Sequence, residues 1–173
     1  VYLEDLKEQV SGIDKLVAGL SAFVTPIAIL ERLLSLTKFT PEEELTIIFT
    51  SGSTGVPKGV VLTQSNIGSN VKAVDHLLQL KRSGVLLGVL PFFHSFGYTA
   101  TLWLPMCFDA AGIYHFNPLD AKIVGKLSEK YKVTLILATP TFLRTYMRRC
   151  EKEQFATLDL VVVGAEKMPL DLA

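Results

Sequence analysis

The residues of this chain whose types and spacing best suit chemistry form the run Thr50-Ser-Gly-Ser-Thr-Gly-Val-Pro-Lys-Gly59. The run holds three glycines, four hydroxyl side chains and one lysine within ten positions. Glycines let backbone N–H groups approach an anion closely, hydroxyls add hydrogen-bond donors, and lysine supplies a positive charge. The composition therefore suits a loop that wraps a polyphosphate. A polar hairpin turn is the alternative, because glycine, serine and proline are also common in turns.

The spacing of this run differs from the common phosphate loop of nucleotide hydrolases. That loop places four residues between its first glycine and a Gly-Lys-Ser/Thr triplet. Counting from Gly52, the second required glycine falls on Pro57. Counting from Gly55, the chain before Lys58 is too short. The sequence thus excludes the P-loop class of nucleotide-binding proteins.

Two other segments carry groups that suit a binding site. In Leu90-Pro-Phe-Phe-His-Ser-Phe-Gly97, His94 stands among aromatic residues, where it is either a binding group or a core histidine. The second segment, Gly164-Ala-Glu166, follows the apolar run Leu160–Val163. Ligands of open α/β sheets gather beyond the carboxyl ends of strands. An ordinary strand-to-helix turn is the alternative for this segment.

The elements that must position these residues alternate between helical and extended patterns. Apolar spacing predicts one helix over 3–20 and a second after Pro26. Strands over 45–50 and 60–63 flank the polar run, and a helix over 65–80 follows, capped by Thr63 or Ser65. Further along, the expected strands are 85–90, 112–115, 133–138 and 158–163, and the expected helices are 100–108, 120–131 and 140–150. This order predicts an α/β fold with a largely parallel sheet flanked by helices.

Composition excludes several classes of protein. With 49% hydrophobic and 20% charged residues, the chain of 173 residues has ordinary globular usage. Its 17 basic and 17 acidic residues cancel, which argues against nucleic acid as a partner. The longest apolar run, Val85–Phe93, is far shorter than the roughly 20 residues of a membrane-spanning helix. His76 and His115 lack partners at metal-ligand spacing, so we expect no structural metal.

Taken together, the three segments resemble motifs of the adenylate-forming superfamily of acyl-CoA synthetases, luciferases and peptide-synthetase adenylation domains. Thr50–Gly59 resembles its phosphate-binding signature, Leu90–Gly97 its aromatic-histidine motif, and Val163–Met168 the loop beside the adenine. The resemblance covers most of the chain from Leu45 onward. It implies that residues 1–173 form part of the large N-terminal, AMP-binding domain of an adenylating enzyme.

The reaction that this resemblance implies is a two-step ligation. A carboxylate attacks the α-phosphate of ATP to give an acyl-adenylate and pyrophosphate, and a thiol then takes the acyl group. The thiol belongs to coenzyme A or to the phosphopantetheine of an acyl carrier protein. We expect the acid to be a fatty acid, and we expect Mg²⁺ to accompany ATP.

The resemblance also assigns roles to residues. Around the ATP phosphates it implies Thr50 together with Ser51, Ser53, Thr54 and Lys58, in a loop whose shape Gly52, Gly55 and Gly59 permit. Phe93, His94 and Gly97 would gate the acyl site, with His94 as a binding group and not a general base. Against the adenine it implies Gly164, Ala165 and Glu166.

A narrower resemblance concerns one bacterial branch. Val1–Leu6, Asn117–Ala121 and Thr139–Arg144 resemble the fused 2-acylglycerophosphoethanolamine acyltransferase / acyl-[acyl-carrier-protein] synthetase. Absent from this sequence are the superfamily's Mg²⁺ glutamate, ribose-binding aspartate, hinge and catalytic lysine, which implies a fragment that is inactive alone.

The unpaired Cys107 and Cys150 suit a reducing compartment, so we expect a cytoplasmic protein. Contact with the inner face of the membrane would come through domains outside this fragment.

Two other functions stay open at this point. One is a non-catalytic adenylation-like module that binds a nucleotide or a partner without turnover. The other is an enzyme that activates an amino acid or an aryl acid. An amino acid's ammonium group usually requires an acidic residue, which His94 and its aromatic neighbours do not supply.

Overall fold

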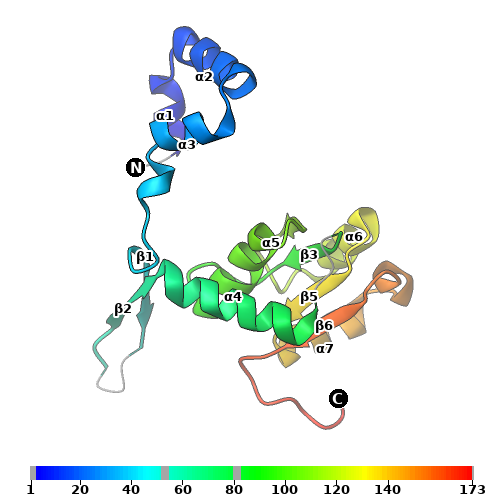
Figure 1. The fold of residues 1–173 in the computed structure, drawn as a ribbon. Helices are drawn as coiled ribbons and strands as arrows, with labels where there is room; N and C mark the ends of the chain where they lie inside the picture. The colour runs from blue at the N-terminus through cyan, green and yellow to red at the C-terminus, as the bar shows by residue number, and fades with distance from the viewer. Residues whose placement is uncertain (1–2, 52–54, 80–82, 173) are drawn as a thin grey trace. The chain divides into compact units, whose positions relative to one another are not determined.

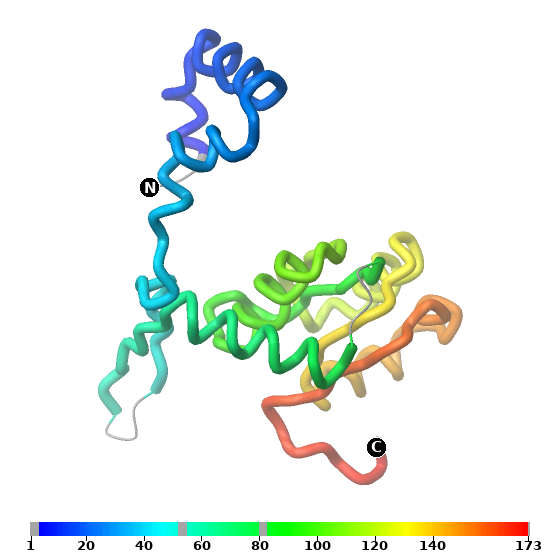
Figure 2. Tube along the Cα trace, in the orientation of Figure 1, coloured from blue at the N-terminus to red at the C-terminus, as the bar shows by residue number. Residues whose placement is uncertain are grey.

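The computed structural model describes residues 3–51, 55–79 and 83–172, and it divides the chain into two compact units, Val1–Glu43 and Glu44–Ala173. Figures 1 and 2 show the path of the chain through both units. Within the described residues, no helix is long and apolar enough to cross a membrane.

The first unit consists of short helices: α1 (Leu3–Gln9), α2 (Gly12–Val24), α3 (Ile27–Leu33) and a 3₁₀ turn, Leu36–Lys38. The prediction of one helix over 3–20 was wrong, because Ser11 begins a new helix. Its hydroxyl accepts the Asp14 N–H, and the Asp14 carboxylate accepts the Ser11 N–H, which together make a capping box. The apolar stripe that suggested a continuous helix runs through both halves and is largely exposed.

The second unit begins with an antiparallel hairpin of β1 (Glu44–Thr50) and β2 (Lys58–Thr63). Helix α4 (Gln64–Leu78) follows directly and is capped by Thr63, one of the two residues expected there. The Thr63 hydroxyl accepts the Asn66 N–H, and the Asn66 side chain accepts the Thr63 N–H. The hairpin and α4 thus form one continuous segment (Figure 1).

A four-stranded parallel sheet in the order β4-β3-β5-β6 forms the centre of this unit. Its strands are β3 (Val85–Gly88), β4 (Ala111–Tyr114), β5 (Leu135–Ala138) and β6 (Leu160–Val163). The helices between them are α5 (Leu104–Cys107), α6 (Ala121–Tyr131) and α7 (Pro140–Arg149). The expected α/β fold with a parallel sheet is confirmed.

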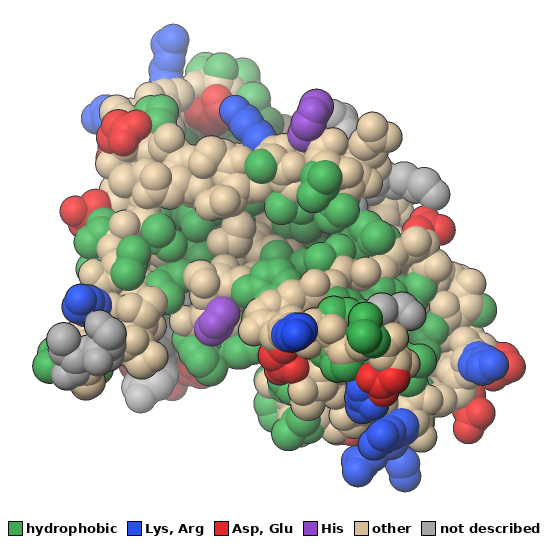
Figure 3. Space-filling view, turned by 90° about the horizontal axis from the view of Figure 1, so that it is seen from below, with side chains coloured by type: hydrophobic (Ala, Val, Ile, Leu, Met, Phe, Trp, Pro, Cys, Tyr) green, Lys and Arg blue, Asp and Glu red, His purple; other side chains and the backbone are tan. Residues whose placement is uncertain are grey.

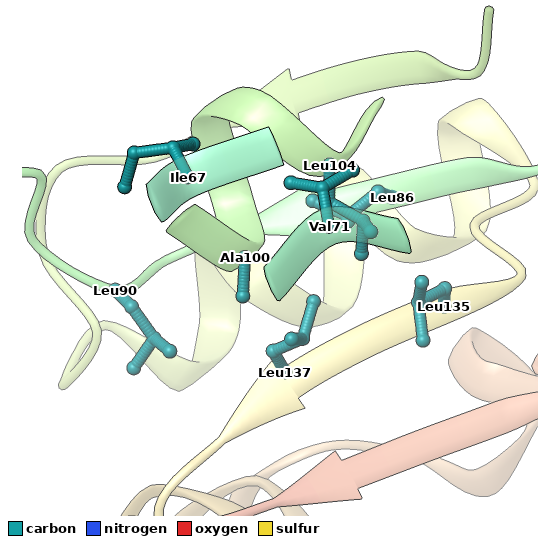
Figure 4. Packing of buried hydrophobic residues seen from close by; sticks show 8 residues of the cluster. All are labelled: Ile67, Val71, Leu86, Leu90, Ala100, Leu104, Leu135 and Leu137. Atoms are coloured by element: carbon teal, nitrogen blue, oxygen red, sulfur yellow. The ribbon is translucent and has the colours of Figure 1, made fainter. Parts of the chain in front are cut away.

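Both faces of the sheet are covered, because successive strand residues point to opposite sides. One face packs against α4 and the segment before α5, in a cluster that includes Val71, Leu86 and Leu137 (Figure 4). The other face packs against α6 and α7 through Leu87, Val124 and Tyr146. This double covering explains why the strands carry apolar residues at nearly every position.

The segment before α5 differs from the sequence prediction. A helix was expected over 100–108, whereas the chain is helical from Gly97, first as a π-helix over Gly97–Trp103 and then as α5. The buried Thr101 hydroxyl donates to the Gly97 carbonyl oxygen at 2.6 Å. π-Helical segments are rare and frequently lie at functional sites.

Candidate functional site

Segments singled out in the sequence meet at the carboxyl ends of the parallel strands. Pro91–Gly97 follows β3, Thr139 follows β5, and Gly164–Glu166 follows β6. They surround a hollow of about 160 Å³. It is lined by Leu90, Pro91, His94, Phe96, Gly97, Thr139, Phe142 and Ala165. This is the end of the sheet at which open α/β folds bind their ligands.

A second hollow, of about 220 Å³, lies at the opposite end of the sheet, where β3, β5 and β6 begin. Its lining is mostly apolar and includes Leu78, Val85 and Leu160. None of the three motif segments contributes to it. We therefore place the candidate site at the carboxyl ends of the strands.

His94 is exposed and lies on the rim of the candidate site, not in the core. Its Nδ1 accepts the backbone N–H of Phe96 at 3.2 Å, which fixes the ring. A neutral imidazole that accepts at Nδ1 carries its proton on Nε2 and so offers a donor there. The structure thus contradicts the core-histidine alternative, and a donor at this rim can bind a carboxylate oxygen.

Gly97 permits the tight path of the aromatic loop. A Cβ atom on this residue would lie 2.1 Å from the Pro91 carbonyl oxygen, closer than any side chain allows. The loop is further closed by backbone hydrogen bonds from His94 N–H to Pro91 O, at 3.2 Å, and from Tyr98 N–H to His94 O, at 2.8 Å. Only glycine at position 97 therefore lets His94 take this place.

The turn after β6 is held by both the sheet and α7. The Gly164 N–H donates to Ala138 O at 3.1 Å, and Ala165 has a left-handed backbone with a φ of 65°. The Glu166 carboxylate accepts the Thr141 hydroxyl at 2.7 Å and the Thr141 N–H at 3.3 Å. The Thr141 side chain is the main cause of the lowered pKa of Glu166. In this geometry the Glu166 carboxylate bonds to α7, and the assignment of Gly164–Glu166 to adenine stays a prediction.

The glycine-rich run connects the two strands of the hairpin. Thr50 pairs with Lys58 and Phe49 with Gly59, so the polar residues extend from the end of the paired strands. Gly55 has a φ of 81°, which side-chain-bearing residues rarely adopt. The expected phosphate-binding residues Gly52, Ser53 and Thr54 lie outside the described residues. The described part of the run thus belongs to a hairpin, and its phosphate-binding role stays a prediction.

The hairpin stands beside the aromatic loop. A hollow of about 430 Å³ separates them, with Ile47 and Phe49 on the hairpin side and Phe92 and Phe93 on the loop side. Phe93 is 83% exposed, so the residue expected to gate the acyl site is accessible. Hydrophobic side chains cover much of the face of the molecule shown in Figure 3.

Two parts of the site were not assigned from the sequence. Thr139 and Phe142 line the hollow, and the available signal was the position of Thr139 directly after an apolar strand. No partner for Arg144 was expected from the sequence. The structure instead pairs it with Asp171, beyond the turn after β6. That pairing joins residues distant in sequence, so no local pattern could reveal it.

Metal ligands are not gathered in the described part of the chain. Over residues 3–51, 55–79 and 83–172, no group of three or more His, Cys, Asp or Glu side chains is placed to hold an ion. Mg²⁺ at phosphate-transfer sites is held by one or two carboxylates together with substrate phosphates. The described residues offer no dedicated cage for this ion.

A family model described as "AMP-binding enzyme" matches residues 7–173. The chain belongs to the AMP-binding enzyme family. Among curated relatives, the long-chain-fatty-acid–CoA ligase of Bacillus subtilis is 29% identical over 148 residues, covering 82% of this chain and 26% of the relative. The 4-chlorobenzoate–CoA ligase of a Pseudomonas species is 34% identical over 133 residues, covering 75% of this chain and 25% of that relative. This AMP-binding chain thus spans about a quarter of the length of the curated relatives it matches.

Solved structures support the same membership. The o-succinylbenzoate CoA synthetase of Bacillus subtilis superposes with a TM-score of 0.69 and 26% identity, over 77% of this chain and 27% of that one. The N-terminal domain of FACL13 from Mycobacterium tuberculosis gives a TM-score of 0.67 and 28% identity, over 76% and 33%. The AMP-binding chain therefore has the fold of part of the N-terminal domain of adenylate-forming enzymes.

Proposed function

We propose that the protein carrying this chain is an ATP-dependent acid–thiol ligase that activates a fatty acid as an acyl-adenylate. The observation that carries the proposal is the convergence of the His94 loop, Thr139 and the turn at Ala165 around one hollow, next to the glycine-rich hairpin. Family membership supplies the chemistry, since relatives named as acid–CoA ligases span aliphatic and aromatic acids.

In the first step, the hairpin loop would hold the β- and γ-phosphates while the acid attacks the α-phosphate. Negative charge grows on the departing pyrophosphate, and hydroxyl, backbone and Lys58 donors oriented in advance stabilise it. The Nε2–H of His94 would bind a carboxylate oxygen of the acid or acyl-adenylate. The hairpin loop thus acts on the leaving pyrophosphate, and His94 acts on the carboxylate.

The lining of the hollow favours a carboxylic acid without an ammonium group. Its residues are apolar except for His94 and Thr139, and none of them is a carboxylate. An amino-acid substrate would leave its ammonium group without a counter-charge in this lining. The hollow beside the hairpin, with Phe49, Phe92 and Phe93, offers further apolar surface for an acyl chain.

We place the acceptor thiol on coenzyme A or on an acyl carrier protein. The stretches Asn117–Ala121 and Thr139–Arg144 support the carrier-protein branch that is fused to a lysophospholipid acyltransferase. We also propose a cytoplasmic protein, at the inner face of the membrane if that fusion is present. A non-catalytic module that binds nucleotide is the competing function.

The deciding experiment is acid-dependent ATP–pyrophosphate exchange with the longest natural polypeptide that contains residues 1–173. Fatty, aryl and amino acids are compared side by side, first without thiol and then with coenzyme A or carrier protein. Exchange with fatty acids supports the proposal, and the thiol that discharges the adenylate identifies the acceptor. Nucleotide binding by the folded protein without exchange, for any acid, would establish the non-catalytic module instead.

A further inference from the structure

The segment after β6, residues 164–172, is tied to helix α7 by two carboxylates. Glu166 accepts hydrogen bonds from Thr141, at the first turn of α7. Asp171 binds Arg144, almost one turn further along the same helix. The segment is the end of the trace in Figure 2 and begins beside the candidate site.

The Arg144–Asp171 contact is bidentate. One guanidinium nitrogen donates to Asp171 Oδ2 at 2.7 Å and the other donates to Oδ1 at 3.0 Å. Paired hydrogen bonds of this kind fix direction as well as distance, which a lysine at the same place would not do. This hydrogen bonding lowers the pKa of Asp171 and raises the pKa of Arg144. Both side chains are partly exposed, at 33% and 65%, so salt will weaken the contact.

The turn that this contact supports is strained. Ala165 lies in the left-handed region at a φ of 65°, which residues with a Cβ atom rarely adopt. Such a conformation persists only where the surrounding structure holds it. The Gly164 N–H bond to Ala138 O holds one side of Ala165, and the Glu166 and Asp171 contacts hold the other. Ala165 itself lines the hollow, so release of the segment would change the site.

We propose that Arg144 is a positioning residue of the nucleotide site, which acts through Asp171 to hold the Gly164–Glu166 turn in its binding conformation. The inference rests on the proposed function and on the prediction, from the family resemblance, that this turn lies against the adenine. Arg144 does not line the hollow and is not a catalytic residue. Its effect therefore falls on the affinity for ATP and not on the chemical step.

The test compares Arg144→Gln, Asp171→Asn and the exchanged pair Arg144→Asp with Asp171→Arg in the longest natural polypeptide. Arg149→Gln is the matched control, since it removes an exposed arginine from the same helix. We expect each single variant to raise the KM for ATP by about three- to fivefold, the range of a well-oriented exposed pair, with kcat almost unchanged. The exchanged pair should recover most of the affinity, and added salt should reduce the difference between wild type and the single variants.

A second measurement separates this inference from the proposed function. Hydrogen exchange of the backbone amides of residues 164–172 reports on the tether whether or not the protein turns over any acid. We expect faster exchange in Arg144→Gln and Asp171→Asn, and wild-type rates in Arg149→Gln. Unchanged exchange rates in both single variants would overturn the tether. Faster exchange with an unchanged KM for ATP in an active enzyme would overturn the positioning role.

Discussion

At the scale of single residues, the site depends on two positions with an unusual backbone path, Gly97 and Ala165. Gly97 lets the aromatic loop fold against Pro91, and Ala165 holds a left-handed turn without being glycine. Chemical groups are then offered by His94 and Lys58, both at exposed positions. Substitutions at Gly97 and Ala165 should therefore disturb the backbone of the site. Substitutions at His94 and Lys58 should remove a binding group.

Replacing Gly97 by Ala should destabilise the fold, because the new methyl group would meet the Pro91 carbonyl oxygen. We expect a loss of about 1–3 kcal/mol in the free energy of unfolding, measured by denaturant titration. Gly68→Ala is the control, since a Cβ atom there, in helix α4, meets no atom within 4 Å. Equal stability of the two variants would contradict the close approach.

Replacing Lys58 by Ala should weaken ATP–pyrophosphate exchange by more than tenfold while the melting temperature stays within about 2 °C, because surface substitutions usually change stability little. Lys58 is exposed at the end of the hairpin. Lys72→Ala, on the exposed side of α4, is the control for removal of a positive charge. Full activity in Lys58→Ala would contradict the assignment of the ATP phosphates to the hairpin loop.

His94→Ala should raise the KM for the acid or slow thioester formation, while the binding of pyrophosphate remains near wild type. The reason is that His94 lines the strand-end hollow, whereas the phosphates are assigned to the hairpin loop. Calorimetric titration of pyrophosphate beside acid-dependent kinetics checks both halves. A variant that fails to fold would contradict the exposed position of His94.

At the scale of elements, helix α7 connects the core to the site. Its Tyr146 side chain is buried against the sheet and donates a hydrogen bond to the Pro118 carbonyl oxygen at 2.8 Å. Its opposite surface receives Glu166 and Asp171 from the segment after β6. Helix α7 thus holds the turn after β6 in place relative to the sheet, because this turn has few buried contacts of its own.

Acid should release the segment after β6 from helix α7. The hydrogen bonds to Thr141 and Arg144 lower the pKa values of Glu166 and Asp171 below their ordinary values of 4.5 and 3.8. Carboxylates with a lowered pKa in the folded state stabilise it above their unfolded pKa, and this contribution is lost as the pH falls through the folded pKa. We therefore expect hydrogen exchange of residues 164–172, corrected for intrinsic rates, to accelerate below about pH 4. Asp171→Asn should show a smaller change over the same range, and an identical pH response would contradict the assignment.

At the scale of the whole molecule, the parallel sheet brings together loops from distant parts of the sequence. The strand order β4-β3-β5-β6 places the segments after β3, β5 and β6 side by side. Helices on both faces make this arrangement rigid, while the hollow stays open at the ends of the strands. In the proposed function, that edge would bind the acid and the nucleotide together.

Much of the fold could be predicted from the sequence alone, because the pattern of neighbouring residues determines local structure. Runs of Val, Leu and Ile between helical stripes indicated a doubly covered parallel sheet, and Thr63 was one of the two residues expected to cap α4. The family resemblance was likewise predicted from residue order and is confirmed by the family match, while the phosphate-binding role of the Gly/Ser/Thr/Lys run stays a prediction. The break at Ser11 was missed, since an apolar stripe continues across it while a single capping box ends the first helix.

Only the tertiary structure decided which of these residues meet. It exposed His94 at a rim, put Thr139 and Phe142 into the lining, and gave Arg144 a partner 27 positions away. Contacts of this kind depend on the order and direction of the strands, which no window of neighbouring residues encodes. The sequence determined the elements and the chemistry they carry, and the packing of the sheet determined the site.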